Sequence, residues 1–313
     1  MIVQLIHPGT QYPLHPHIST HTQRTFLPHS PRRGIRWWNR QNTATSKGNQ
    51  HYRKYLEAEG QFITSLASKT KVGRFCFWGE WEPQSVFTLA GNPTGKALLP
   101  NAVHRPMLHI PDKETLTGLH NTDPYVFGEA FYYGLCKQRP WNALSQLNPG
   151  DIILFGTNYT AGFSPDTVMV IAAGTKAGDY LNKQAPFTVP EIYQKITLDK
   201  PEPAGPNLYH PHCGFTLYKA RMHGSARSPF SFAPCLPHFR NKAVTHVEKP
   251  IIPFDALDSW LAASGKSWNR KRNSKQAVRA FGSVDKNTFF KELANCILQS
   301  GHALGTTVNS QLH

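Results

Sequence analysis

Short apolar runs, separated by turn residues, predict β-strands through the middle of the chain. These runs lie at residues 74–78, 151–155, 167–172 and 214–218. A Pro-Gly-Asp turn at residues 149–151 leads into the second run, and a short polar loop separates the second run from the third. We therefore predict an antiparallel hairpin over residues 147–171.

The apolar spacing changes to a helical period in the C-terminal third. Three segments show it, at residues 254–263, 274–281 and 285–299. In the last segment four side chains at i, i+4, i+7 and i+8 share one face: Phe289, Leu293, Cys296 and Ile297. We predict that this face packs on the strands.

Composition sets the scale of the fold. The chain has 313 residues, of which 39% are hydrophobic, and its 25 prolines and 23 glycines favour many irregular connections. We expect an α+β fold in three parts. These are a basic extended N-terminal arm at residues 1–50, an α+β core at 51–250 and a helical C-terminal extension at 251–313 packed on the core.

Positive charge dominates the surface chemistry. The 34 Lys and Arg residues exceed the 19 Asp and Glu residues by 15, and residues 1–56 contain no acidic residue at all. A surplus of this size favours a polyanionic partner such as nucleic acid, although a merely basic, soluble surface is the alternative.

Two basic clusters are candidates for contacts with a DNA backbone, because guanidinium and ammonium groups neutralise phosphates. The first is PRRGIRWWNR at residues 31–40, whose tryptophans could stack on bases or anchor the arm. The second lies at residues 265–282 around Trp268. The predicted backbone contacts are Arg32, Arg33, Arg36, Arg40, Arg270, Lys271 and Arg272.

Several classes of protein lack support in the sequence. There is no run of about 18 apolar residues for a membrane span and no signal-peptide pattern. The five cysteines are odd in number and widely spread, which is typical of reduced thiols in a cytoplasm. No phosphate-binding loop or dinucleotide fingerprint occurs, so we expect no nucleotide cofactor.

The stretch FCFWGEWEPQS at residues 75–85 sets carboxylates beside indoles. A carboxyl group packed against an aromatic ring can transfer protons near neutral pH because burial raises its pKa. Glu80 is therefore the first candidate acid or base and Asp123 the second, although Asp123 lies in a turn sequence, where bonding to the backbone is the usual role. The side chains predicted to bind a base are Trp78, Trp81, Glu82, Phe127, Tyr132 and Gln138.

Cys136 is the candidate nucleophile, because the neighbouring Lys137 could stabilise a thiolate. If residues 129–138 form a helix, the thiol shares a face with Glu129, Tyr132 and Tyr133, and a strand would break that grouping. A buried structural cysteine is the alternative.

Two short clusters of nitrogen and sulfur ligands could hold zinc. They contain His212, Cys213, Cys235 and His238, although neither has the CxxC spacing. Polar contact with phosphate or backbone is the alternative for the histidines, and we expect no cofactor to be required.

The 147–171 hairpin resembles the barrel hairpin of PUA-like domains, the superfamily that includes the ASCH, EVE and YTH modules. The segments FWGEWEPQS, LHIPD, NTDPYVFGEAFYYGLCKQ and SPFSFAPC also resemble proteins of DNA base-modification clusters, in particular the DpdC family of the bacterial DNA 7-deazaguanine system. The resemblance implies a PUA-like mixed β-barrel core and an enzyme that converts 7-cyano-7-deazaguanine in DNA to the 7-amido form.

Three functions follow as hypotheses. The first is a cytoplasmic DNA-binding enzyme that hydrates the nitrile of a modified guanine, with Cys136 or a water activated by Glu80 as the nucleophile. The second is a non-catalytic reader of modified bases that acts with other proteins of a modification or defence system. The third is a structural nucleic-acid scaffold.

Overall fold

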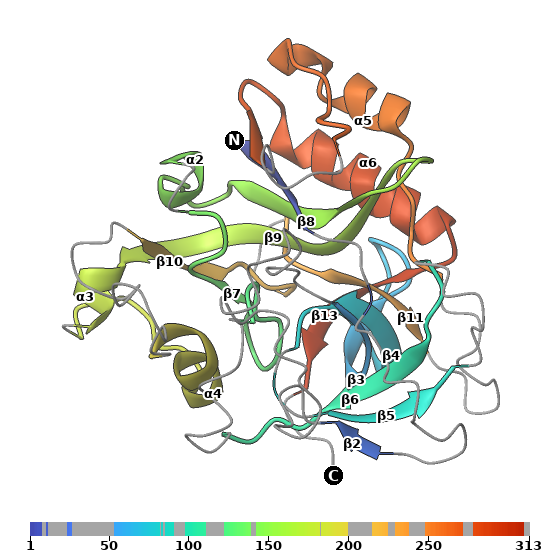
Figure 1. Cartoon of the computed structure of the whole chain (residues 1–313). Coiled ribbons are helices and arrows are strands. Elements are labelled where there is room, and N and C mark those ends of the chain that lie inside the picture. Colours follow the sequence, from blue (N-terminus) through green and yellow to red (C-terminus); the bar gives the residue numbers. More distant parts are fainter. Residues whose placement is uncertain are drawn as a thin grey trace, which may run out of the picture.

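The fold is mixed α+β, with mostly strands and few helices over the described residues (Figure 1). The computed structural model describes residues 1–7, 11, 24–26, 53–81, 83, 85–90, 98–110, 122–138, 142–181, 183–199, 215–224, 229–237, 248–271 and 278–309. None of the helices in these ranges is both long and apolar enough to cross a membrane.

A six-stranded sheet lies under the C-terminal helices, with the strand order β12-β1-β8-β9-β10-β7. β1 runs parallel to β8, and the other neighbours are antiparallel. The hairpin predicted over residues 147–171 is confirmed as β8 and β9. The strands are β1 (Ile2–Ile6), β7 (Tyr132–Tyr133), β8 (Ile152–Asn158), β9 (Phe163–Lys176), β10 (Thr216–Ala220) and β12 (Val278–Phe281).

The first strand corrects the prediction of an extended arm from residue 1. β1 is buried between β8 and β12, and its apolar side chains contribute to two apolar clusters. Val3 and Leu5 pack with the cluster that faces the barrel, whereas Ile2 packs with the cluster beneath α5 and α6. Because both faces are covered, the strand is almost continuously apolar. Most of the remaining arm lies outside the described residues.

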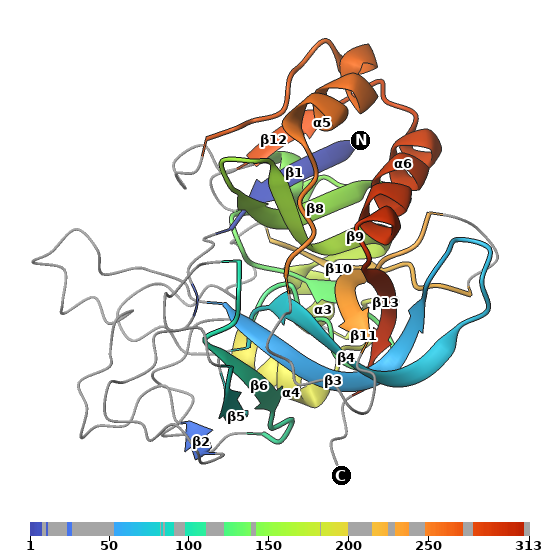
Figure 2. The same ribbon diagram turned by 90° about the vertical axis from the view of Figure 1, so that its right-hand side faces the viewer.

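A second sheet of seven strands has the order β13-β11-β4-β3-β6-β5-β2. β13 also pairs with β3, so β3, β4, β11 and β13 close into a small antiparallel barrel (Figure 2). A small closed β-barrel is therefore present, but it is antiparallel where a mixed barrel was predicted, and the β8–β9 hairpin lies outside it, in the six-stranded sheet. The strands are β2 (Arg24–Phe26), β3 (Lys54–Ile63), β4 (Lys71–Gly79), β5 (Ser85–Leu89), β6 (Ala102–Pro106), β11 (Ala233–Pro237) and β13 (Ala303–Val308).

Closure of the barrel depends on a glycine. A Cβ atom at Gly60 would lie 2.1 Å from the carbonyl oxygen of Thr307, so a side chain there would push β13 away from β3. A glycine is what allows two backbones to approach this closely.

Two helices cover one face of the six-stranded sheet (Figures 1 and 2). The face predicted for the last helix is confirmed, because Phe289, Leu293 and Ile297 are buried against the sheet and Cys296 is partly buried there. The helices are α2 (Asn142–Ser145), α3 (Ala177–Leu181), α4 (Glu191–Tyr193) with a π-helical turn at Gln194–Leu198, α5 (Phe254–Trp260) with a 3-10 turn at Ala262–Ser264, and α6 (Lys286–Gln299).

The helix predicted over residues 274–281 is wrong in its described part. Residues 278–281 form strand β12, which pairs with β1. Apolar residues three apart, such as Val278 and Phe281, are compatible with a helical face as well as with this short strand. Pairing with the edge of β1 favours the strand.

Candidate active site

Polar side chains from both sheets meet where strand ends converge. His7 directly follows β1, Arg53 directly precedes β3, and Glu80 directly follows β4. Asp166 lies within β9, and Cys136 lies in the turn after β7. The first four are almost fully buried and Cys136 is partly buried. Such a concentration of buried polar groups at element ends is typical of a functional site.

A β-bulge explains how Asp166 reaches the cluster. Thr167 pairs with Phe155 and Pro165 pairs with Gly156, so Asp166 is the extra residue of β9. Bulges redirect a side chain from the regular alternation of a strand. The bulge also needs Gly156, because a Cβ atom there would lie 2.3 Å from the carbonyl oxygen of Ser164.

Cys136, His7 and Asp166 form a linear chain of contacts. Cys136 Sγ lies 3.6 Å from His7 Nε2, and His7 Nδ1 lies 3.5 Å from Asp166 Oδ2. The backbone N–H of His7 donates to the carbonyl of Gly156 at 2.6 Å, which holds the histidine against β8. A thiol, an imidazole and a carboxylate in this order are the parts of a nucleophile, its base and the group that orients the base.

Arg53 links this chain to Glu80. Its Nη2 donates to Glu80 Oε2 at 3.0 Å and also contacts His7 Nδ1, and its Nε lies 3.3 Å from Asp166 Oδ2. Glu80 therefore lies in the site, as an ion-pair partner of the guanidinium. Glu82, its predicted neighbour, lies outside the described residues.

The environment keeps the resting thiol and imidazole neutral. Burial, with help from the charge of Arg53, lowers the pKa of His7 to about 4. Burial also raises the pKa of the Cys136 thiol, and the charges of Asp123 and Glu80 add to this. At Asp166, burial alone would raise the pKa, but the charge of Arg53 and the adjacent His7 imidazole outweigh it and lower the pKa. Removal of the thiol proton must therefore accompany attack on a substrate.

Asp123 holds the turn that carries the thiol. Its carboxylate accepts the N–H groups of Gly134, Leu135 and Cys136 at 3.0, 2.7 and 2.6 Å, and the hydroxyl of Tyr193 at 3.1 Å. Burial nevertheless raises the pKa of Asp123 to about 6. The structure thus places Asp123 next to Cys136, where it fixes the backbone.

The residues after Cys136 complete the turn. Lys137 adopts a left-handed backbone conformation with φ of 64°. Gln138 clamps β10, because its Nε2 donates to the carbonyl of Thr216 at 2.6 Å and its Oε1 accepts the Thr216 N–H at 2.8 Å. The Gln138 amide is thus engaged at both ends. The helical alternative for residues 129–138 does not occur, since β7 lies within that segment.

The aromatic candidates are buried. Trp81 packs on Phe127 with ring centroids 5.0 Å apart, inside the main core. Tyr132 stacks on Tyr193 at 5.9 Å. Trp78 belongs to a separate small cluster with Tyr55, whose ring lies 4.8 Å away.

A buried lysine covers the face of Trp78. Lys249 Nζ lies 3.3 Å from the Trp78 ring centroid and donates to the Tyr159 hydroxyl at 2.7 Å. Burial lowers the pKa of Lys249 to about 6, and the nearby charge of Asp166 offsets part of that effect. The site therefore contains an amine whose charge changes near neutral pH.

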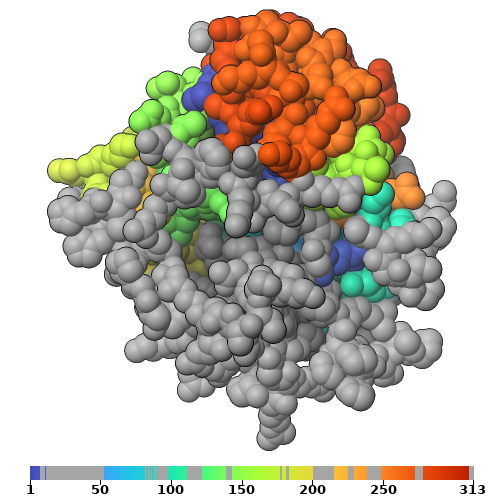
Figure 3. Space-filling view, turned by 45° about the horizontal axis from the view of Figure 1, so that its top comes forward, coloured from blue at the N-terminus to red at the C-terminus, as the bar shows by residue number. Residues whose placement is uncertain are grey.

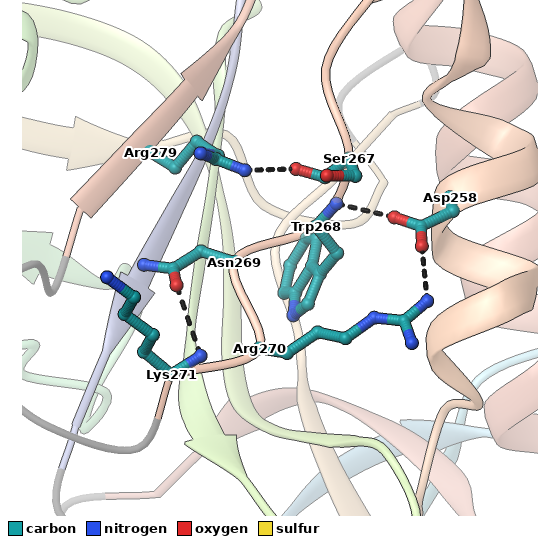
Figure 4. Close-up of a pocket in the computed structure, with 7 residues that line it drawn as sticks. All are labelled: Asp258, Ser267, Trp268, Asn269, Arg270, Lys271 and Arg279. Atoms are coloured by element: carbon teal, nitrogen blue, oxygen red, sulfur yellow. Dashed lines mark hydrogen bonds and ion pairs between the residues drawn. The ribbon is translucent and has the colours of Figure 1, made fainter.

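A shallow groove lies in the second basic cluster, between α5 and β12 (Figure 4). Arg270 lines it but is paired with Asp258 at 2.6 Å and with Asp255 at 3.1 Å. Trp268 is buried and stacks on Phe281 at 5.8 Å, so its ring belongs to the core. Lys271 and Arg279 also line the groove.

The residues that line this groove belong to the C-terminal part of the chain, which forms the orange part of the surface in Figure 3. The other predicted backbone contacts, Arg32, Arg33, Arg36, Arg40 and Arg272, lie outside the described residues.

The zinc hypothesis rests mainly on residues outside the described ranges, namely His212, Cys213 and His238. Cys235 is described and is buried in β11. In the part of the chain that the structure describes, no three His, Cys, Asp or Glu residues gather as metal ligands do.

Comparisons with protein-family models, curated proteins and solved structures found no match. The site must therefore be interpreted from its own chemistry.

Sequence reasoning missed four members of the site: His7, Arg53, Asp166 and Lys249. His7 had the clearest signal, because it ends the apolar run MIVQLI and precedes Pro-Gly. The others carried no local signal, since they come together through the pairing of distant strands.

Proposed function

We propose that this protein is a DNA-binding enzyme that uses Cys136 to hydrate the nitrile of 7-cyano-7-deazaguanine to the carboxamide. The observation that carries the proposal is the contact of Cys136 Sγ with His7 Nε2 at 3.6 Å, with Asp166 beyond the imidazole. A nitrile carbon is an electrophile that a thiol can attack once a base removes its proton.

The reaction balances with water as the only other reactant. His7 takes the thiol proton as sulfur adds to the nitrile carbon, and the imidazolium returns that proton to the nitrile nitrogen, which yields a thioimidate. Water then adds to the thioimidate carbon with His7 as the base. Cleavage of the carbon–sulfur bond releases the carboxamide and restores the thiol. Asp166 stabilises the imidazolium in both steps, as it lies beside Nδ1.

The surroundings support a nucleic-acid substrate. The net charge of +15 favours binding to a polyanion, and the resemblance of the β8–β9 hairpin to that of PUA-like domains favours recognition of a modified base. From the resemblance to proteins of DNA base-modification clusters, we propose that the protein acts in the cytoplasm with other proteins of such a cluster.

Mass spectrometry of nucleosides tests the proposal. The substrate is an oligonucleotide with one 7-cyano-7-deazaguanine, and we expect wild-type protein to convert that base to the amide. Cys136→Ala and His7→Gln should abolish the conversion. The control is Cys296→Ser, because Cys296 is a partly buried cysteine on α6, outside the site.

Intact-protein mass spectrometry should also detect the thioimidate on Cys136 after an acid quench. Binding of the oligonucleotide by wild-type protein without any conversion would contradict the enzyme and support a non-catalytic reader of modified bases instead.

A further inference from the structure

Two groups compete for one nitrogen of His7. The guanidinium of Arg53 and the carboxylate of Asp166 both lie at Nδ1, and the carboxylate is 3.5 Å away. An arginine can only donate a hydrogen bond, whereas a carboxylate of lowered pKa accepts one. A neutral imidazole has one N–H, so Nδ1 cannot serve both partners at once.

The competition decides whether His7 can act as a base. If Nδ1 accepts from Arg53, the proton is on Nε2 and points toward the sulfur of Cys136, so the ring cannot take the thiol proton. If Nδ1 donates to Asp166, the lone pair of Nε2 faces the thiol and can accept its proton. The second tautomer is the active one.

In the resting protein the geometry favours a hydrogen bond from Arg53 to Nδ1 over one from Nδ1 to Asp166. The guanidinium is in direct contact with Nδ1, and it is held there by Glu80 at 3.0 Å and by Asp166 at 3.3 Å. The remaining contacts of His7 leave the tautomer undecided, since the Phe155 ring is apolar and Thr157 bonds to the backbone carbonyl of His7.

We propose that Arg53 is a positioning and specificity-determining residue, which holds His7 in the inactive tautomer until a guanine-type base accepts its N–H groups. The choice of base rests on the function proposed above, whereas the resting tautomer does not. Once Arg53 donates to the substrate, Nδ1 can donate to Asp166, and Cys136 is activated.

The substrate's chemistry explains why a guanine-type ring would act as the trigger. Arginine commonly recognises the O6 side of guanine. In 7-cyano-7-deazaguanine the ring atom beside O6 on that edge is the carbon that bears the nitrile. An Arg53 bonded to O6 would therefore lie next to the reacting group. An adenine-type ring has an amino group at this position. Because this group donates hydrogen bonds, it cannot accept the N–H groups of Arg53, which then stays bonded to Nδ1 of His7.

Nitrogen-15 NMR of the imidazole tests the resting state directly in the free wild-type protein, with His7→Gln to assign the signals. We expect a proton on Nε2 and none on Nδ1 at pH 7. A proton on Nδ1 in the free protein would overturn the proposal, whether or not any substrate binds.

The release step is tested in Cys136→Ala, which we expect to bind the substrate without turnover. We compare oligonucleotides that contain 7-cyano-7-deazaguanine or 7-cyano-7-deazaadenine. The proton should move to Nδ1 with the first and stay on Nε2 with the second. The release step would be overturned if the proton moved with both oligonucleotides or with neither. It would also be overturned if the oligonucleotide with 7-cyano-7-deazaguanine failed to bind. A correct shift without amide formation by wild-type protein would contradict the proposed function alone.

A conservative variant of Arg53 separates its effect on the His7 tautomer from its effect on the stability of the fold. Arg53→Lys cannot reach His7, Glu80 and Asp166 together, so His7 should adopt the Nδ1–H form without substrate and Cys136 should react several-fold faster with iodoacetamide. An unchanged tautomer in a variant with native-like melting would count against a positioning role. If the variant does not fold, the nitrogen-15 spectrum of the free wild-type protein still decides which tautomer of His7 is present at rest.

Discussion

At the scale of single residues, burial shifts the titration of several site groups away from their ordinary ranges, and each shift makes stability depend on pH. The pKa of His7 falls from 6.5 to about 4, so the folded state binds fewer protons than the unfolded state between these values. Its contribution to stability is present above pH 6.5 and is lost as the pH falls toward 4. Lys249 and Asp123 make separate predictions.

Lys249 should make the protein more stable as the pH rises from neutrality. Its pKa falls from 10.5 to about 6 on folding, so the folded state binds fewer protons in that window. Lys249→Met should flatten the rise in unfolding free energy between pH 7 and pH 10 and should be at least as stable as wild type at pH 7, because no amine is then desolvated. Urea denaturation at several pH values measures both.

The control for that experiment is Lys291→Met, at an exposed position on α6. It should keep the wild-type slope. A Lys249→Met variant with the wild-type slope would show that the ammonium is not desolvated in the folded state.

The contribution of Asp123 to stability changes with pH in the opposite direction to that of Lys249. Its pKa rises from 3.8 to about 6, so the folded state binds its proton more tightly and this group's contribution to stability is lost as the pH rises through 6. Asp123→Asn should remove that dependence. It should also cost about 1–3 kcal/mol of unfolding free energy, because an amide cannot accept all three N–H groups of the Cys136 turn.

Calorimetry between pH 4 and 8 measures this change, and the rate of Cys136 alkylation reports whether the turn has moved. Asp199→Asn, which changes a partly exposed carboxylate that pairs with Lys195, is the matched control. Equal effects of the two substitutions would argue against a positioning role for Asp123.

At the scale of elements, local periodicity predicted what local contacts determine. The β8–β9 hairpin and the buried face of α6 were correct, because the turn and the apolar spacing lie within each segment. β1 was missed because the arginines and prolines that follow it dominated the interpretation of residues 1–50. β12 was mistaken for a helix because its partner, β1, is distant in sequence.

The role of the bulge in β9 can be tested by adding a single methyl group at Gly156. Gly156→Ala would place Cβ 2.3 Å from the Ser164 carbonyl oxygen, so the bulge must shift and carry Asp166 with it. We expect a loss of about 1–3 kcal/mol of unfolding free energy, as in an overpacked core, together with a fall in nitrile hydration. Gly282→Ala is the control, because a Cβ atom there meets nothing within 4 Å. Equal stability of the two variants would contradict this account.

At the scale of the whole molecule, the excess of basic residues should control binding to DNA. Each phosphate contact contributes about 0.9 to the slope of log affinity against log salt concentration. Lys271 and Arg279 line the groove in Figure 4, and Lys266 directly precedes its Ser267. Replacing these three residues by glutamine should reduce that slope by about 2 to 3 if this region binds the backbone.

Fluorescence anisotropy at several salt concentrations measures this slope. The matched control replaces Lys176, Lys183 and Lys195, which lie around α3 and α4, away from the groove (Figure 1). An equal change in both triple variants would mean that the charge acts over the whole surface, without a defined track.

The sequence by itself determined the α+β class, the central hairpin, the last helix and the basic character of the protein, because these depend on periodicity and composition. It also selected Cys136, Glu80 and Asp123 as candidates from their residue types and neighbours. Tertiary structure alone decided their relations. His7 lies beside Asp166 because β1 and β9 both flank β8 and a bulge redirects Asp166, and Arg53 meets Glu80 because β3 pairs with β4. Cys136 meets His7 although it follows β7, at the far edge of the same sheet. Contacts between residues far apart in the chain leave no periodic trace in the sequence, so the site became visible only when the strands were paired.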